Sequence, residues 1–342
     1  MYKFQLYKNT GRGIYIGAID AITKAYIRKN EVFADAFNYF MYDGRQKIQP
    51  EQLRELDSTE IAILLNEKDT KDKTNKEKEA SEQKMVQKYR DLLKTATIME
   101  DGEATYVLLG IENQTEVHYA MPVRNMLYDA MQYNQQVTEI AEKHKGKKGG
   151  KRQQKISTGE FLSGFYKNNK LIPVITLVLF FNPGEWDGPR SLFDMLDISN
   201  PIFKKYAQDY KIHIISPKEI LESDLKKFSS SLREVIGCIK YSNDKNKLAA
   251  FIQDNPRMNI EVEAARVLEV ITHTHIKREE VDDMGNVNMC KAIQEMIQDG
   301  RDEGRVQLLV TLIQSGDISL QRAAALMNMT PEEFQEKSKM IS

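Results

Sequence analysis

Residues 91–114 read DLLKTATIMEDGEATYVLLGIENQ, and this stretch decides the fold. Two strand-like runs flank the dipeptide Asp101-Gly102, and Asp-Gly between such runs is the strongest short signal for a β-hairpin. If these two residues form the loop, Asp91 lies directly opposite Glu112 on one face of the hairpin, with Cβ atoms about 5 Å apart. Like charges placed opposite each other destabilise a sheet, so something should compensate them. A divalent metal ion held between two carboxylates is the usual answer.

The segments around the hairpin predict a mixed α/β core. Apolar residues recur at helical spacing in 31–42, and 122–140 reads as a helix with proline in its first turn. The runs 171–181 and 210–216 are continuously apolar and β-rich, which is typical of strands buried on both faces. From Pro217 onward the patterns are helical. The fold class that follows is a mixed α/β domain with an α-helical C-terminal lobe.

The same pattern predicts three parts of the chain. The first domain spans 1–216 with a core at about 31–216, and it is followed by a helical lobe at 217–299 and a C-terminal helical hairpin at 300–342. A polar insert at 66–84 and a basic loop at 143–157 interrupt the first domain, and Gly300–Gly304 is expected to break the chain before the hairpin. The hairpin resembles a helix-turn-helix in size, but Glu332 and Glu333 open its second helix and phosphates would repel them. Packing or homo-oligomer contacts are the better interpretation of this hairpin.

Composition excludes several protein classes. Charged residues make up 29% of the 342 residues and apolar residues 41%, which fits a globular chain rather than a disordered one. The N-terminus lacks the apolar stretch of a signal peptide, and the most apolar run, 171–181, is too short to span a bilayer. The two cysteines, Cys238 and Cys290, make a disulfide framework improbable, so we expect a cytoplasmic protein without a membrane partner. Because the net charge is −1, any anion binding must come from local patches.

Seven segments of this chain, taken in order, resemble one family. They are FADAFN at 33–38, RDLL at 90–93, GIENQ at 110–114, YAMPVRNMLYDA at 119–130, FLSGFY at 161–166, IPVITLV at 172–178 and EWDGPRSL at 185–192. Together they resemble the recombination-promoting nuclease (Rpn) and transposase family of the PD-(D/E)XK superfamily, over roughly residues 30 to 240. The resemblance implies a restriction-endonuclease-like mixed sheet flanked by helices. It also implies a Mg²⁺-dependent DNA endonuclease linked to recombination or mobile elements.

The resemblance assigns roles to the residues at the ends of the hairpin. Asp91, Glu112 and the backbone carbonyl of Asn113 would bind Mg²⁺ through oxygen, and Gln114 would orient the attacking water. Most of the superfamily carries lysine at the position of Gln114, whereas members of this family commonly carry glutamine. A neutral amide cannot stabilise negative charge developing on phosphorus as an ammonium can. Slow cleavage, or help from another cation such as Arg124, is therefore expected.

Other residues are candidates for auxiliary roles. Asp57 is a rival for the first carboxylate, but it would need a long excursion to reach the end of the hairpin. Asp35 and Asn38 lie three apart on the helix at 31–42, where they either support the site or belong to an ordinary polar face. Arg124 and Tyr128 lie four apart on one helix face, where the arginine either contacts a phosphate or forms a structural ion pair with Asp129 or Glu116.

The basic loop is the densest run of positive charge. Lys147, Lys148, Lys151 and Arg152 would bind DNA phosphates without reading bases, and no aromatic residue is interleaved among them. The alternative is a solvated loop without a ligand.

Two functions of different classes remain open at this point. The first is the metal-dependent endonuclease, which the intact pair Asp91 and Glu112 favours. The alternative is a non-catalytic DNA-binding or protein-binding module on a degenerate nuclease core, which Gln114 and the nearly neutral net charge favour.

Overall fold

The computed structural model describes residues 12–56, 91–100, 103–146, 156–253, 255–272 and 281–341. The chain divides into two compact units, Met1–Leu248 and Ala249–Ser342. This division falls later than the expected end of the first domain at 216, and the first unit includes helix α8 (Leu232–Tyr241). Asp57, the polar insert at 66–84 and most of the basic loop lie outside the described residues.

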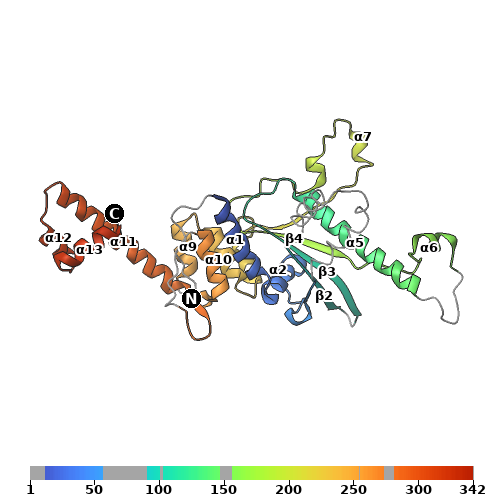
Figure 1. Cartoon of the computed structure of the whole chain (residues 1–342), viewed down its shortest axis with the longest axis horizontal. Coiled ribbons are helices and arrows are strands. Elements are labelled where there is room, and N and C mark those ends of the chain that lie inside the picture. Colours follow the sequence, from blue (N-terminus) through green and yellow to red (C-terminus); the bar gives the residue numbers. More distant parts are fainter. Residues whose placement is uncertain are drawn as a thin grey trace, which may run out of the picture. The chain divides into compact units, whose positions relative to one another are not determined.

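The first unit is built on a five-stranded mixed sheet (Figure 1). Its strands follow the order β1 (Arg54–Glu55), β2 (Leu92–Glu100), β3 (Glu103–Gln114), β4 (Val174–Phe180) and β5 (His213–Ile215). The first three are antiparallel neighbours, whereas β4 is parallel to β3 and β5 is parallel to β4. Leu92 pairs with Ile111 and Glu100 pairs with Glu103, so the predicted register of the hairpin is confirmed.

Helices cover both faces of this sheet. Successive residues of a strand point to opposite faces, and near the end of β3 the side chain of Asn113 contacts α1 (Arg12–Ile27) while that of Glu112 contacts α5 (Met121–Gly146). Helix α2 (Asn30–Tyr42) follows α1 on the first face, and α5 is the crossover that parallel strands β3 and β4 require (Figure 1). The predictions of α2, α5, β4 and β5 are confirmed. Helix α1 was not predicted.

Shorter elements complete the first unit. They are the 3-10 helices η1 (Pro50–Gln52), η2 (Leu192–Met195) and η3 (Glu222–Lys227), and the helices α6 (Thr158–Ser163) and α7 (Pro201–Lys204). The apolar core on the α5 face includes Met121, Val178, Phe180 and Trp186, all buried. It is this packing that fixes α5 over the C-terminal ends of β3 and β4.

A buried lysine joins β2 to the first two helices. Lys94 is 1% exposed, and its ammonium donates to the carbonyl of Arg28 at 2.6 Å and to Oδ1 of Asn30 at 2.5 Å. The ammonium also lies 4.8 Å from the centre of the Phe33 ring. Burial lowers the pKa of Lys94, so these contacts offset a real desolvation cost. They hold the junction of α1 and α2 against the sheet.

The second unit is mainly helical, as predicted for the C-terminal part of the chain. Helix α9 (Lys245–Ile252) crosses the division and is followed by η4 (Pro256–Met258), β6 (Asn259–Glu261), α10 (Val262–Thr272), β7 (Asn286–Asn288), α11 (Met289–Gln314), α12 (Leu320–Leu326) and α13 (Pro331–Ile341). Strands β6 and β7 pair with each other. No helix among the described residues is long and apolar enough to cross a membrane.

The predicted break at Gly300–Gly304 is wrong, because α11 continues through both glycines. A glycine within a helix costs only about 1 kcal/mol relative to alanine. Beyond the glycines, Val306 and Leu309 pack against Phe334 of α13 and two alanines of α12. Burial of these side chains outweighs the cost of the glycines, so the end of α11 packs together with the two short helices α12 and α13.

Asp35 and Asn38 hold the backbone of the first unit. Asp35 is 1% exposed, and its carboxylate accepts hydrogen bonds from the backbone N–H and the hydroxyl of both Ser229 and Ser230. Asn38 accepts from the N–H of Ile48 at 2.8 Å and donates to the carbonyl of the same residue. The expectation that α2 supplies auxiliary site residues is therefore corrected: both side chains fasten α2 to its neighbouring loops.

Asp35→Ala should destabilise the protein strongly. The substitution removes a buried carboxylate and leaves the partly buried N–H groups of Ser229 and Ser230 without their charged acceptor, which should lower the free energy of unfolding by about 2–4 kcal/mol. Urea denaturation measures the effect, and Glu31→Ala, an exposed acidic residue on the same helix, is the control. A loss below about 0.5 kcal/mol for Asp35→Ala would contradict the structural role.

Candidate functional site

Asp91 lies directly before β2, where the hairpin ladder ends. Its Oδ2 accepts a hydrogen bond of 2.9 Å from the backbone N–H of Asn113, so the side chain extends the ladder by one bond. Its Oδ1 lies 2.8 Å from the ammonium of Lys24, and the side chain is 7% exposed. The carboxylate therefore sits at the edge of β3 and contacts helix α1. The sequence predicted Asp91 to lie within the strand, whereas the structure places it one residue before the strand begins.

Glu112 is fully buried beneath α5. Its Oε2 lies 3.1 Å from Nη2 of Arg124, and its side chain is 0% exposed. Arg124 also donates from Nε to the hydroxyl of Tyr128 at 3.2 Å, and its guanidinium lies 5.6 Å from the centre of that ring. An ionised carboxylate is costly to bury without a counterion, and the guanidinium supplies one. Arg124 therefore forms a structural ion pair, but its partner is Glu112 and not Asp129 or Glu116, the partners expected from the sequence.

Both carboxylates act electrostatically on the same two side chains of α5. Burial works to lower the pKa of Arg124, but the charges of Glu112 and Asp91 and the hydroxyl of Tyr128 outweigh it and raise that pKa. Burial, followed by the charge of Glu112, raises the pKa of Tyr128, and Asp91 adds to the effect. The phenol of Tyr128 therefore stays protonated at neutral pH, and Arg124 stays charged.

Helix α1 contributes a group of residues that the sequence interpretation missed. The ammonium of Lys24 lies 2.7 Å from Oδ2 of Asp20, so it bridges two aspartates. The amide of Asn113 donates to the hydroxyl of Thr23 at 2.5 Å and to Oδ1 of Asp20 at 3.3 Å. Burial works to lower the pKa of Lys24, but its two aspartate partners outweigh it and raise that pKa. The spacing of Asp20 and Lys24, four residues apart, is the signal that could have indicated this helix.

The charge repulsion that the hairpin register predicts is compensated by cations of the chain. Lys24 reaches Asp91 from one face of the sheet, and Arg124 reaches Glu112 from the other. Each carboxylate thus has a positively charged partner, on a helix that packs on a different face. The two helices and the end of the hairpin together form the candidate site.

The oxygen atoms at this site suit a hard divalent cation. Mg²⁺ prefers oxygen ligands, and the donors are the carboxylates of Asp91 and Glu112 with the backbone carbonyl of Asn113. In a β-ladder the N–H and C=O of one residue point toward the same neighbouring strand. The N–H of Asn113 donates to Asp91, so the carbonyl of Asn113 points to the same side, toward β2. The described residues include no group of three or more Asp, Glu, His or Cys side chains suited to a metal. In the arrangement that the resemblance implies, the backbone carbonyl of Asn113 would complete the donor set.

Gln114 ends strand β3 two residues after Glu112. Residues two apart on a strand share a face, which places Gln114 on the α5 face with Glu112. Its backbone carbonyl accepts from Phe181 at 2.8 Å, so the strand end is fixed. Lys147, Lys148, Lys151 and Arg152 lie outside the described residues, and their role in DNA binding stays a prediction.

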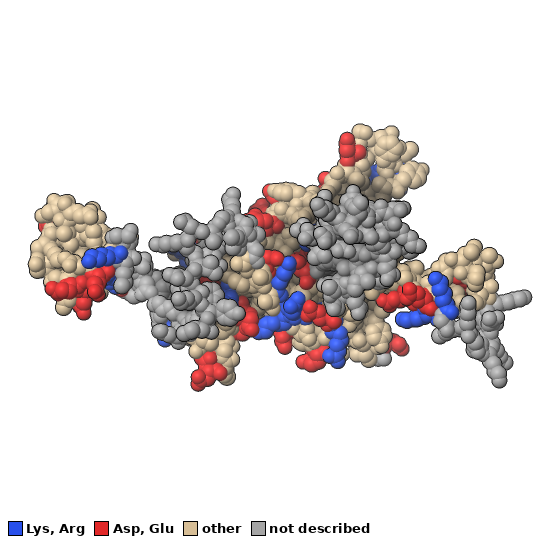
Figure 2. Space-filling model, in the orientation of Figure 1, with Lys and Arg blue, Asp and Glu red and all other residues tan. Residues whose placement is uncertain are grey.

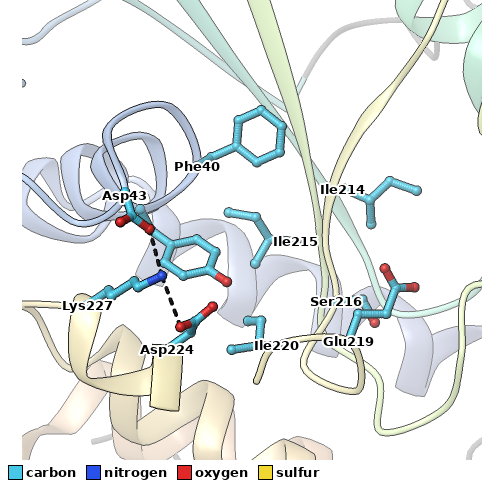
Figure 3. Close-up of a pocket in the computed structure, with 10 residues that line it drawn as sticks. Phe40, Asp43, Ile214, Ile215, Ser216, Glu219, Ile220, Asp224 and Lys227 are labelled. Atoms are coloured by element: carbon cyan, nitrogen blue, oxygen red, sulfur yellow. Dashed lines mark ion pairs between the residues drawn. The ribbon is translucent and has the colours of Figure 1, made fainter. Parts of the chain in front are cut away.

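A cavity of about 300 Å³ lies elsewhere in the first unit (Figure 3). Its lining includes Phe40, Ile215 and Ile220, and the ammonium of Lys227 lies 2.6 Å from Asp43 and 2.9 Å from Asp224. None of its lining residues is a candidate from the sequence. The lysine that bridges two aspartates here offers a matched counterpart to Lys24.

Comparisons with known proteins add no relative: no family model, no curated protein and no solved structure matches this chain. The site must therefore be interpreted from its own geometry and from the residues that form it.

Arg124→Met should expose the coupling between Arg124 and Glu112. The substitution takes the guanidinium from a buried carboxylate and should lower the free energy of unfolding by about 2–3 kcal/mol. Adding Glu112→Gln should restore about 1–2 kcal/mol of that loss, because the buried group is then neutral. Urea unfolding of the two single variants and the double variant measures the coupling. Strictly additive effects would show that the ion pair is not a stabilising unit.

Proposed function

We propose that this chain is a Mg²⁺-dependent DNA endonuclease of the Rpn type, built on a restriction-endonuclease-like fold and linked to recombination or mobile elements. One observation carries the proposal: the Asp91 carboxylate is hydrogen-bonded to the backbone N–H of Asn113, the residue that follows Glu112 in β3. Two carboxylates and a backbone carbonyl thus lie at the ends of neighbouring strands in a mixed sheet flanked by helices. This is the arrangement that the resemblance implies for such a nuclease.

The residues have distinct roles in the proposed reaction. Asp91, Glu112 and the carbonyl of Asn113 would hold the ion, which supplies an activated water and charge neutralisation when bound. Gln114 would orient the water through its amide, on the face it shares with Glu112. Hydrolysis joins hydroxide from one water to phosphorus and breaks one phosphorus–oxygen ester bond, and the departing oxygen takes up a proton. Arg124 would keep Glu112 ionised while the site is without an ion.

DNA contacts would depend on local groups of basic residues. On the face shown in Figure 2, the Lys and Arg side chains of the described residues lie among acidic ones rather than in one continuous patch. This fits the net charge of −1. The basic run at 147–152 would add phosphate contacts that are independent of DNA sequence.

A second function has an observation in its favour. Asp91 and Glu112 already have cationic partners within the chain, and Gln114 contributes no charge. A core of this kind can be stable without an ion, so it could serve as a non-catalytic DNA-binding or protein-binding module. The two functions differ in whether Mg²⁺ stabilises the protein and whether DNA is cut.

Nicking of supercoiled plasmid separates the two functions. The protein should convert supercoiled plasmid to the open circular form with Mg²⁺ and not with EDTA. Glu112→Gln keeps nearly the same shape but removes a charged ligand, so it should lower the nicking rate by about 100-fold or more. Glu103→Gln, an exposed glutamate at the other end of the same strand, should nick like the unmodified protein.

Thermal melts complete this test. Mg²⁺ should raise the melting temperature of the unmodified protein and of Glu103→Gln, because an ion that binds the folded state stabilises it, and should do so less in Glu112→Gln. A protein that shows neither Mg²⁺-dependent nicking nor Mg²⁺ stabilisation would contradict the proposed nuclease function and would favour the non-catalytic binding module.

A further inference from the structure

The proposed site needs a cation close to the substrate phosphate, and Gln114 cannot provide it. A neutral amide donates hydrogen bonds but does not neutralise charge developing on phosphorus. The structure places two cationic side chains against the carboxylates, Lys24 on α1 and Arg124 on α5. The two differ in how firmly they are held.

Arg124 is tied to its position by several contacts. Its guanidinium is engaged by the buried Glu112 and by the hydroxyl of Tyr128, and it packs near the ring of that tyrosine. Moving it would leave a fully buried carboxylate without its counterion, which is among the costliest changes in a protein interior. Arg124 is therefore committed to keeping Glu112 charged.

Lys24 is placed differently, between one enclosed and one open carboxylate. Its ammonium contacts Asp91, whose side chain is 7% exposed, and Asp20, whose side chain is 42% exposed. The side chain of Lys24 is itself 36% exposed, and ion pairs open to water are weak. Lys24 can therefore break its ion pair with Asp91 at little cost. Its ammonium would still lie close to Asp91, because Asp20, one helical turn away on α1, keeps its own ion pair with Lys24.

Helix α1 is itself fixed at the strand end. The hydroxyl of Thr23, the residue before Lys24, accepts a hydrogen bond of 2.5 Å from the amide of Asn113. The Asn113 backbone in turn bonds Asp91. The base of the Lys24 side chain is thus held against the backbone that borders the proposed ion site, while its ammonium stays partly open to solvent.

We propose that Lys24 supplies the positive charge that Gln114 lacks, and that it competes with the metal ion for Asp91. Without an ion, the ammonium neutralises Asp91. With an ion bound at that carboxylate, Lys24 would stay paired with Asp20 and would face the phosphate of the bound DNA. This inference rests on the proposed nuclease function, and it names a catalytic residue on a helix outside the hairpin.

Two measurements on Lys24→Met test the competition and the catalytic role separately. Thermal melts across a Mg²⁺ titration should show apparent Mg²⁺ binding about fivefold tighter than in the unmodified protein, because an ion pair competing for Asp91 is gone. The nicking rate at saturating Mg²⁺ should fall on the order of 100-fold, because the phosphate loses its cation. Tighter metal binding with slower cleavage is a combination that a merely destabilised protein would not give.

Lys227→Met is the matched control. Lys227 also bridges two aspartates, Asp43 and Asp224, at the separate cavity of Figure 3. Its removal should leave both Mg²⁺ binding and nicking unchanged. Equal changes in Lys24→Met and Lys227→Met would overturn the assignment.

Asp20→Asn gives a test of opposite sign. Without the second aspartate the ammonium of Lys24 relies on Asp91 alone, so apparent Mg²⁺ binding should weaken by about threefold to fivefold. This variant also serves if Lys24→Met folds poorly. Mg²⁺ binding that is unchanged or tighter in Asp20→Asn would contradict the competition.

The outcomes also separate this inference from the proposed function. Nicking by Lys24→Met at the rate of the unmodified protein would show that Lys24 is not the phosphate cation, while the nuclease would stand. An unmodified protein that binds Mg²⁺ without cutting DNA would contradict the nuclease and the catalytic role of Lys24, whereas the competition for Asp91 would still be measured by the melts.

Discussion

The hydrogen bond from the Asn113 backbone to the Asp91 carboxylate is the contact on which the candidate site depends. It forms where the backbone ladder of the hairpin ends, and it holds a carboxylate against the backbone at the end of β3. The register fixes Glu112 next to it on β3. Two negative charges therefore meet at one strand end, and the surrounding helices have to compensate them.

The compensation explains why two helices on opposite faces meet at this point. Lys24 and Arg124 each pair with one carboxylate, so the charge repulsion becomes a link between the helical layers and the sheet. The two links differ in kind. The Arg124 pair has a fully buried carboxylate and is supported by Tyr128, whereas Lys24 is more exposed and is shared between the enclosed Asp91 and the exposed Asp20. A site built in this way can be stable without an ion and still present the oxygen ligands that one prefers.

The hairpin register could be predicted from sequence because it depends on local chemistry. An Asp-Gly dipeptide between two β-rich runs allows few alternatives, and a shift by one residue would turn every side chain to the other face. The helices α2 and α5 and the strands β4 and β5 were predictable for the same reason, since each has a clear periodicity or apolar run. The register also placed Glu112 at the end of the hairpin, and the helix that follows carries Arg124, so their contact could be anticipated in part, while their functional roles stay predictions.

Other features depend on contacts between distant parts of the chain. Helix α1 carries Lys24 and Asp20, but it begins more than sixty residues before the hairpin in a segment without a strong amphipathic pattern. From the sequence, Asp35 could have been an auxiliary residue of the metal site. Only the fold shows that its carboxylate accepts a hydrogen bond from the backbone N–H of Ser229, almost two hundred residues later. The glycines of α11 suggested a break that tertiary packing overrides. Sequence periodicity reports local preference and cannot report such partners.

The most direct test of the account is a crystal soaked in Mn²⁺ and measured at the manganese absorption edge, because Mn²⁺ accepts the same oxygen ligands as Mg²⁺. We expect an anomalous peak bound by Asp91, Glu112 and the carbonyl of Asn113, with the ammonium of Lys24 moved from Asp91 and still paired with Asp20. The absence of a peak at these residues in a fully soaked crystal, with Lys24 still on Asp91, would contradict it.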